Sequence, residues 1–107
     1  MANKILIALS NPISVDREDE FNDWYDRVHG KEVTRLAGIR NITRYRAKAQ
    51  VVPPGGQLTY RYLALYEVDD GDVALAALAD SAGKFSMSDS IDLEGACAMM
   101  FELIPAR

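Results

Sequence analysis

Two residues near the middle of the first half of the chain are of types that can move a proton. His29 is the only histidine in the sequence, and Glu32 follows it three residues later. In a helix, residues at this spacing lie on the same side. An imidazole with a pKa near ~6.5 can accept or donate a proton at neutral pH, and an adjacent carboxylate can fix its tautomer. The pair predicts general acid–base chemistry, with His29 as base or acid and Glu32 as its orienting partner.

The helix that would carry this pair makes the position of Glu32 unusual. At about 100° per residue, one apolar stripe of that helix is formed by Phe21, Tyr25, Val28 and Leu36. Glu32 falls in the middle of the stripe, and His29 lies on its flank. A carboxylate near a core needs a partner or a raised pKa. The alternative is that Glu32 reaches solvent or pairs with Arg35 or Arg44, while His29 is only a packing residue.

Aromatic side chains supply candidates for the rest of a binding site. Tyrosine hydroxyls can donate hydrogen bonds to an enolate or phenolate oxygen. The residues expected to contact a substrate are Tyr25, Tyr45, Tyr62, Tyr66 and Phe85. Packing in a core or an interface is the alternative for the tyrosines. Residues 83–95 form a long loop, which is either a lid that touches a ligand through Phe85 and Met87 or an arm that contacts a second subunit.

The hydrophobic pattern predicts six elements in a single domain that spans residues 1–107. They are a strand at 4–10, a helix at 17–36, strands at 39–49 and 59–68, a helix at 70–82 and a strand at 96–104. Asp16 is the expected cap of the first helix, and Gly38 its expected stop. The order βαββαβ predicts an α+β, ferredoxin-like fold, in which a four-stranded antiparallel sheet carries two helices on one face.

The sheet predicted in this way has apolar side chains on both faces. In the strand at 59–68, Tyr62 and Tyr66 lie on one side and Leu63 and Leu65 on the other. Two helices cover only one face, so the other face would leave an apolar patch in water. The simplest solution is a homodimer, sheet against sheet, and the alternative is a complex with another protein. The strand at 39–49 has one polar face, which favours an edge position.

Composition narrows the possible partners. Twelve Lys and Arg against sixteen Asp and Glu give a net charge of −4, which disfavours binding to nucleic acid or to an anionic membrane. One cysteine excludes an internal disulfide, and one cysteine with one histidine cannot close a structural zinc site. The apolar run Ile5–Leu9 is far too short for a membrane span or a signal peptide. We therefore expect a cytoplasmic domain without a metal, and Gly55-Gly56 lacks the context of a phosphate loop.

The segment Phe-Asn-Asp-Trp-Tyr-Asp-Arg-Val-His-Gly-Lys-Glu-Val at 21–33, with Leu-Ala-Gly-Ile at 36–39 and Arg-Tyr-Arg at 44–46, resembles a known family. It is similar to the EthD-like branch of the dimeric α+β barrel superfamily, which shows an aromatic pair, then a histidine, then a glycine turn into the second strand. The resemblance implies a homodimer whose sheets close into a barrel, with a cavity between sheet and helices. Relatives include muconolactone-type isomerases, polyketide cyclases, small monooxygenases and haem-degrading enzymes. The helix histidine of methylmuconolactone isomerases, which is thought to transfer protons, matches His29.

Three hypotheses for function follow. The first is a cofactor-independent isomerase, cyclase or dehydratase that acts through an enol on a small ketone, lactone or polyketide-like aromatic, with His29 and Glu32 as catalytic residues. The second is a ligand-binding or accessory protein with the same cavity and no chemistry. The third is oxygen chemistry on haem or an aromatic substrate, involving Trp24, His29 and Asn11. Because one fold hosts many activities, the fold alone does not choose among them.

Overall fold

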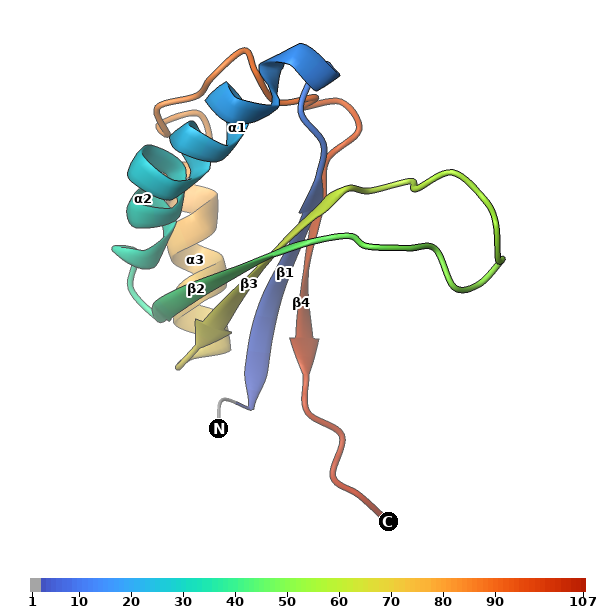
Figure 1. Ribbon diagram of the computed structural model, residues 1–107. Coiled ribbons are helices and arrows are strands. Elements are labelled where there is room, and N and C mark those ends of the chain that lie inside the picture. The colour runs from blue at the N-terminus through green and yellow to red at the C-terminus, as the bar shows by residue number, and fades with distance from the viewer. Residues whose placement is uncertain (1–2) are drawn as a thin grey trace.

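The computed structural model describes residues 3–107 and arranges them as a sheet with a layer of helices on one side (Figure 1). The strands are β1 (Lys4–Ser10), β2 (Ile39–Arg46), β3 (Tyr62–Val68) and β4 (Cys97–Glu102). They pair antiparallel in the order β2-β3-β1-β4. The helical layer consists of the short turn η1 (Val15–Arg17), α1 (Glu18–Trp24), the π-helical turn η2 (Tyr25–His29), α2 (Gly30–Thr34) and α3 (Gly71–Ser81). The ferredoxin-like fold predicted from the order of the elements is confirmed.

The strands are shorter than predicted where the chain leaves the sheet. β2 ends at Arg46 and β3 begins at Tyr62, so residues 47–61 form an arm that projects beyond the sheet (Figure 1). The backbone N–H of Ala47 donates to the carbonyl of Arg61 at 2.8 Å, which is where the pairing of the two segments stops. β2 lies at the edge of the sheet and β1 and β3 lie at its centre, as the polarity of the strands predicted.

A bulge in β2 changes which side chains face the helices. Ile39 pairs with Val68 and Ile42 with Tyr66, so β2 has one residue more than β3 between these two pairs. Strict alternation would place Ile39 and Ile42 on opposite faces, whereas both pack against the core. The bulge also directs Arg44 toward the helices, because Arg44 is two residues beyond Ile42.

The core lies between the sheet and the helices. It consists of Leu6, Phe21, Trp24, Tyr25, Val33, Ile39, Tyr62, Ala64, Tyr66, Val68 and Ala74. The chain makes a close approach at Gly38, which has a φ of 85°. A side chain there would meet the carbonyl oxygen of Asp70 at 2.7 Å and the nitrogen of Ala74 at 2.8 Å. Gly38 therefore lies in the turn between the first helical run and β2 and lets this turn pack against the start of α3, where Asp70 accepts a hydrogen bond from the Val73 N–H at 3.1 Å.

The first helical run differs in two ways from the continuous helix predicted at 17–36. Asp16 is not its cap, because Asp16 lies inside η1 and accepts a hydrogen bond from the Ser14 hydroxyl at 2.6 Å. The run also ends earlier, at Thr34.

The π-helical turn η2 overturns the predicted position of Glu32 in the apolar stripe. A π-helical turn holds an extra residue, so every later residue is displaced around the helix by about one position. Val33, only 4% exposed, occupies the buried position that regular periodicity gives to Glu32. Glu32 itself is half-buried. Gly30 follows η2 and packs closely against β2, since a Cβ there would lie 3.1 Å from Cδ1 of Ile42.

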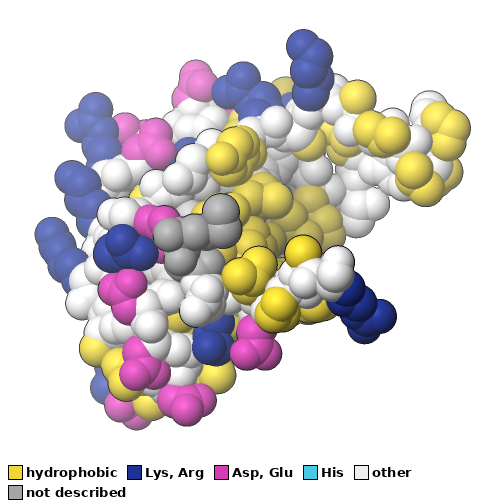
Figure 2. Space-filling view, turned by 90° about the horizontal axis from the view of Figure 1, so that it is seen from below, with side chains coloured by type: hydrophobic (Ala, Val, Ile, Leu, Met, Phe, Trp, Pro, Cys, Tyr) yellow, Lys and Arg dark blue, Asp and Glu magenta, His cyan; other side chains and the backbone are white. Residues whose placement is uncertain are grey.

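The far face of the sheet has no helices over it. Tyr62 and Tyr66 are buried under the helices, while Leu63 and Leu65 lie on the opposite face, as predicted. The strand registers place further side chains on this open face, namely Ile5, Ile7, Leu9, Tyr45, Cys97, Met99 and Phe101. Figure 2 shows hydrophobic side chains gathered in a broad area between the projecting arm and the C-terminal residues. Within residues 3–107, no helix is long and apolar enough to cross a membrane.

Candidate functional site

His29 is the last residue of η2 and is surrounded by aromatic rings. Its imidazole stacks on Trp24 with the ring centroids 4.6 Å apart and the planes at 16°. Tyr25 and Phe85 pack against it in T-shaped arrangements at centroid distances of 5.1 and 5.5 Å. Trp24 and Tyr25 come from the same helical run, whereas Phe85 comes from the loop that joins α3 to β4. This packing holds the imidazole in one orientation.

The environment of His29 favours its uncharged form. The Nδ1 atom is buried and has no hydrogen-bond partner among the described residues. Burial lowers the pKa of His29 below its ordinary value, and the negative charge of Glu32 offsets only part of this effect. These surroundings therefore favour a neutral imidazole at pH 7, which can accept a proton.

Glu32 is bonded to the loop rather than to His29. Its two carboxylate oxygens accept from the backbone N–H of Ser86 at 3.0 and 3.1 Å. The structure thus brings Glu32 close enough to His29 to influence its charge, but directs the carboxylate at Ser86. The predicted alternatives for Glu32, pairing with Arg35 or Arg44, are not the contacts it makes.

A cavity of about 250 Å³ lies beside His29. It is lined by Ala8, Leu9, Ser10, Trp24, Tyr25, His29, Met87, Ile91, Leu93, Ala96, Cys97 and Ala98. None of these described residues is a lysine, arginine, aspartate or glutamate, and most of them are apolar. The volume is slightly below the ~300 to 1,000 Å³ of typical small-molecule pockets. The cavity therefore suits a small, uncharged ligand with one or two polar atoms.

The structure brings some of the predicted substrate-binding residues to the cavity and leaves others away from it. Tyr25 lines the cavity, and burial raises the pKa of its hydroxyl, which stays protonated. Phe85 contacts the imidazole. Tyr62 faces the helices, but its hydroxyl donates to Glu18 and accepts from the amide of Asn22.

Tyr66 and Tyr45 lie away from the lining of the cavity. The Tyr66 hydroxyl is buried without a hydrogen-bond partner among the described residues, and burial raises its pKa far above the ordinary value. Tyr45 is 55% exposed on the open face of the sheet, so the sheet separates it from His29. The sequence pattern did not reveal this, because the bulge in β2 decides the side on which Tyr45 lies.

Arg44 contacts Tyr25, one of the residues that line the cavity. Its guanidinium lies 4.5 Å from the centroid of the Tyr25 ring and donates to Asp26 at 3.0 Å and to Asn22 at 2.7 Å. This side chain is only 16% exposed. It fixes the Tyr25 ring by a cation–π contact and connects β2 to the first helical run.

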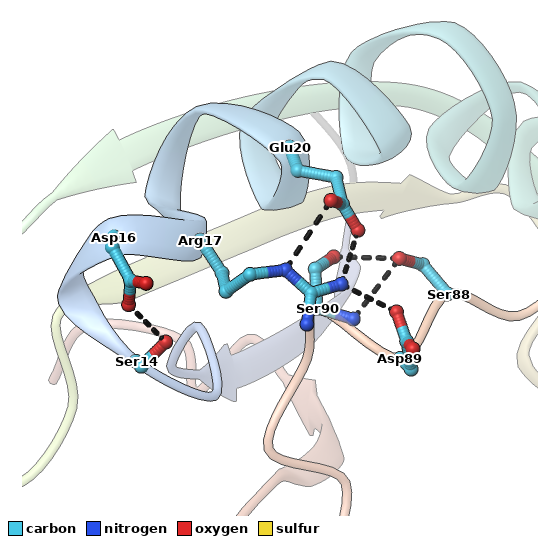
Figure 3. Close-up of polar contacts among 7 residues, drawn as sticks. All are labelled: Ser14, Asp16, Arg17, Glu20, Ser88, Asp89 and Ser90. Atoms are coloured by element: carbon cyan, nitrogen blue, oxygen red, sulfur yellow. Dashed lines mark hydrogen bonds and ion pairs between the residues drawn. The ribbon is translucent and has the colours of Figure 1, made fainter.

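The loop from residue 82 to residue 96 forms one wall of the cavity. Its second half is tied to η1 and to the end of β1. Arg17 bridges Glu20 and Asp89, and Ser90 is fully buried beside Ser88 (Figure 3). The backbone N–H of Ile13 donates to the Ser90 carbonyl at 2.6 Å.

The sequence pattern missed several residues of the site, and three of them make it what it is. Ser10 and Ile91 line the cavity, and Ser86 binds Glu32. The only available signal was that Ser10 ends an apolar strand. Asn11, the residue that the hypothesis of oxygen chemistry invokes, is bonded instead to residues 59–61: its amide donates to the Thr59 carbonyl at 2.9 Å and its oxygen accepts from the Arg61 N–H at 2.7 Å.

Comparison with known proteins found similarity only to solved structures. No protein-family model matches the chain, and no curated protein matches it either. An ethyl tert-butyl ether D (EthD) family protein from Bacillus halodurans superposes with a TM-score of 0.64 at 18% identity, covering 97% of this chain and 100% of the other. An EthD-like protein from Ralstonia eutropha gives 0.60 at 12% identity, over 100% of this chain and 97% of the other. The chain has the fold of EthD-like proteins.

A third solved structure extends the comparison. HapK from Hahella chejuensis superposes on the EthD-like fold of this chain with a TM-score of 0.56 at 14% identity, covering 97% of this chain and 95% of the other. These matches confirm, at the level of the fold, the resemblance seen in residues 21–46. At such low identity, these matches show that the chain has the EthD-like fold but do not show its activity.

Proposed function

We propose that this protein binds a small, uncharged, mostly apolar molecule beside His29 and transfers a proton on it without a cofactor. The observation that supports this most is the imidazole of His29 on the wall of a mostly apolar cavity, in surroundings that favour its uncharged form. A cyclic ketone, lactone or phenol of about one ring matches the cavity in size and polarity. The EthD-like fold is compatible with this use.

The reaction proposed is an isomerisation through an enol. A ring nitrogen of His29 accepts a proton from the carbon next to a carbonyl, and the electron pair of the C–H bond moves to form an enolate. The hydroxyl of Tyr25 or Ser10 donates a hydrogen bond to the enolate oxygen. The imidazolium then returns the proton to another carbon of the same molecule, so that no oxidant or reductant is needed. Glu32 stabilises the transient imidazolium by its charge.

Exchange of carbon-bound hydrogen for deuterium tests this step. The wild-type protein is incubated in D2O with a panel of cyclic enones and unsaturated lactones, and incorporation is followed by NMR. We expect catalysed exchange that falls about 100-fold or more in His29→Ala, because a general base contributes at least this much. Asp23→Ala changes an exposed residue of α1 and serves as the control. Equal exchange by wild type and His29→Ala would exclude proton transfer by His29.

A binding protein without chemistry is the second candidate. It is favoured by the contacts of Glu32, whose carboxylate holds Ser86 and is therefore not directed at the imidazole as in a catalytic pair. This candidate predicts that panel members raise the melting temperature, as any ligand specific for the folded state does, and show no exchange.

We also propose that the protein acts as a homodimer joined through the open face of the sheet. Several large apolar side chains are exposed there, including Tyr45, Met99 and Phe101 at 55%, 51% and 45%. Contiguous apolar surface of this kind is rare on monomers. In this arrangement Tyr45 contributes to the dimer interface rather than to ligand binding. The free thiol of Cys97 lies on the same face, which suits the reducing cytoplasm expected from the composition.

A further inference from the structure

Ser86 is held at both of its backbone polar groups by side chains of the first helical run. The Trp24 Nε1–H donates to the Ser86 carbonyl at 2.7 Å, and Glu32 accepts from the Ser86 N–H at 3.0 and 3.1 Å. Trp24 and Glu32 lie on either side of His29 in the sequence. Ser86 is exposed and lies more than fifty positions after these two residues in the sequence. The contacts therefore join two separate parts of the chain and do not belong to a turn within the loop.

The residues next to Ser86 cover the candidate site. Phe85 packs against the imidazole in a T-shaped arrangement at a centroid distance of 5.5 Å, and Met87 lines the cavity. Residues 84–87, called the strap below, therefore lie over His29 and the cavity. Met87 itself is 49% exposed, so the strap has solvent on its outer side.

The strap differs from the part of the loop that follows it. Ser90 is fully buried, the Asp92 N–H donates to the Asn11 carbonyl at 2.9 Å, and Pro12 forms a β-bridge with Ile91. These backbone contacts attach residues 90–92 to the end of β1. The strap is instead attached by the Trp24 and Glu32 side chains at Ser86, by the packing of Phe85 against the core and by one hydrogen bond from the Lys84 N–H to the Ser81 carbonyl at 2.9 Å. A segment with so few backbone hydrogen bonds opens locally at lower cost in free energy than residues 90–92.

We propose that Glu32 and Trp24 are positioning residues that keep the strap closed over the cavity, and that release of Ser86 is the step that admits and discharges ligands. Glu32 contributes most to this hold because a carboxylate is a stronger acceptor than a neutral group. The inference rests on the proposed ligand site, although closure of the strap is measured without any ligand.

Two measurements on the full chain test the hold on Ser86. The first is amide hydrogen exchange at Ser86, followed by NMR. The second is quenching of Trp24, the single tryptophan of the chain, by acrylamide, a small neutral molecule that reaches the indole when the strap opens. In Glu32→Ala we expect Ser86 to exchange about tenfold faster. We also expect the quenching constant of Trp24 to rise about threefold, because the indole becomes more accessible.

Two further variants show whether the effect of Glu32→Ala comes from the lost hydrogen bond, from the lost charge or from a general loosening of the helical run. Glu32→Gln keeps a side-chain oxygen that accepts from Ser86, so most of the protection should return. Asp23→Ala removes an exposed carboxylate that pairs with Arg27 in the same helical run, and should leave both readouts unchanged.

The proposal is overturned if Glu32→Ala leaves exchange at Ser86 or quenching of Trp24 at the wild-type value. It is also overturned if the wild-type Ser86 amide exchanges as fast as in an unfolded chain, a result that needs no variant. Failure of the proposed function looks different. In that case the strap responds as expected to Glu32→Ala, while no ketone, lactone or phenol binds or exchanges hydrogen.

Discussion

At the scale of the residue, the site depends on a half-buried imidazole whose Nδ1 is shielded from water. His29 is stacked on Trp24 and packs in T-shaped contacts with Tyr25 and Phe85. This packing has an energetic consequence, because the charged form of a buried imidazole is disfavoured. The same burial suits the proposed chemistry, since a neutral imidazole on the cavity wall can accept a proton.

The lowered pKa of His29 predicts a specific dependence on pH. As the pH falls below about 6.5, the unfolded chain takes up a proton at His29 before the folded protein does, so the free energy of unfolding decreases. The decrease continues down to the lower pKa of the folded state. His29→Gln should lack this contribution.

Denaturant unfolding between pH 8 and pH 4 checks this prediction, with the fluorescence of Trp24 as a second readout. A protonated imidazole quenches the indole stacked on it, so the wild-type fluorescence should fall with a midpoint below 6.5, and His29→Gln should show no such step. A midpoint above 6.5 would mean that Glu32 outweighs burial, and would contradict the neutral imidazole.

At the scale of the element, the π-helical turn η2 determines which side chains reach the site. The extra residue in this turn gives the buried position to Val33 and leaves Glu32 on the side that meets the loop. The turn is followed directly by Gly30, where a Cβ would lie only 2.9 Å from the Tyr25 carbonyl oxygen. The absence of a side chain at position 30 is therefore part of what permits this local geometry.

Gly30→Ala should destabilise the protein, although alanine is normally the better residue in a helix. The added methyl would be 2.9 Å from the carbonyl oxygen of Tyr25 and 3.1 Å from Cδ1 of Ile42, so either the turn or β2 must move. We expect a loss of about 1–3 kcal/mol in the free energy of unfolding, as for other overpacked positions.

Gly56→Ala is the control for this substitution. Gly56 lies in the arm, and the nearest atom to an added Cβ is the Pro53 oxygen at 3.8 Å. We expect its effect on chemical denaturation to stay within about 0.5 kcal/mol. If Gly30→Ala is as stable as the wild type, the turn does not depend on a glycine.

At the scale of the whole molecule, one layer of helices leaves the sheet uncovered on its other side. The central strands β1 and β3 carry Ile7, Leu9, Leu63 and Leu65 on that side, and β4 adds Met99. A sheet of this kind is stable in water only if the apolar face is small or is covered. In the proposed homodimer, a second copy related by a twofold axis would cover this face with the same residues from both chains.

Met99→Lys should separate the proposed dimer. It places a charge on the open face, whereas Leu75→Lys places the same charge on the outer side of α3 at an equally exposed position, 52% against 51%. Light scattering at micromolar concentration should give about twice 11.9 kDa for the wild type and for Leu75→Lys, and 11.9 kDa for Met99→Lys. A wild-type protein that is monomeric under these conditions would rule out this interface.

The order of the elements and the two apolar faces of the sheet were predictable from the sequence, because both depend on hydrophobic patterns within ten or so residues. The same local pattern pointed to His29 and Tyr25. The sequence pattern alone did not show the π-helical turn, the bulge in β2 or the true partner of Glu32. The Glu32 hydrogen bond joins residues 54 positions apart, and the bulge decides the face of Tyr45 through pairing with β3. Contacts of this range exist only once the chain has folded, so only the tertiary structure could place the loop over the histidine.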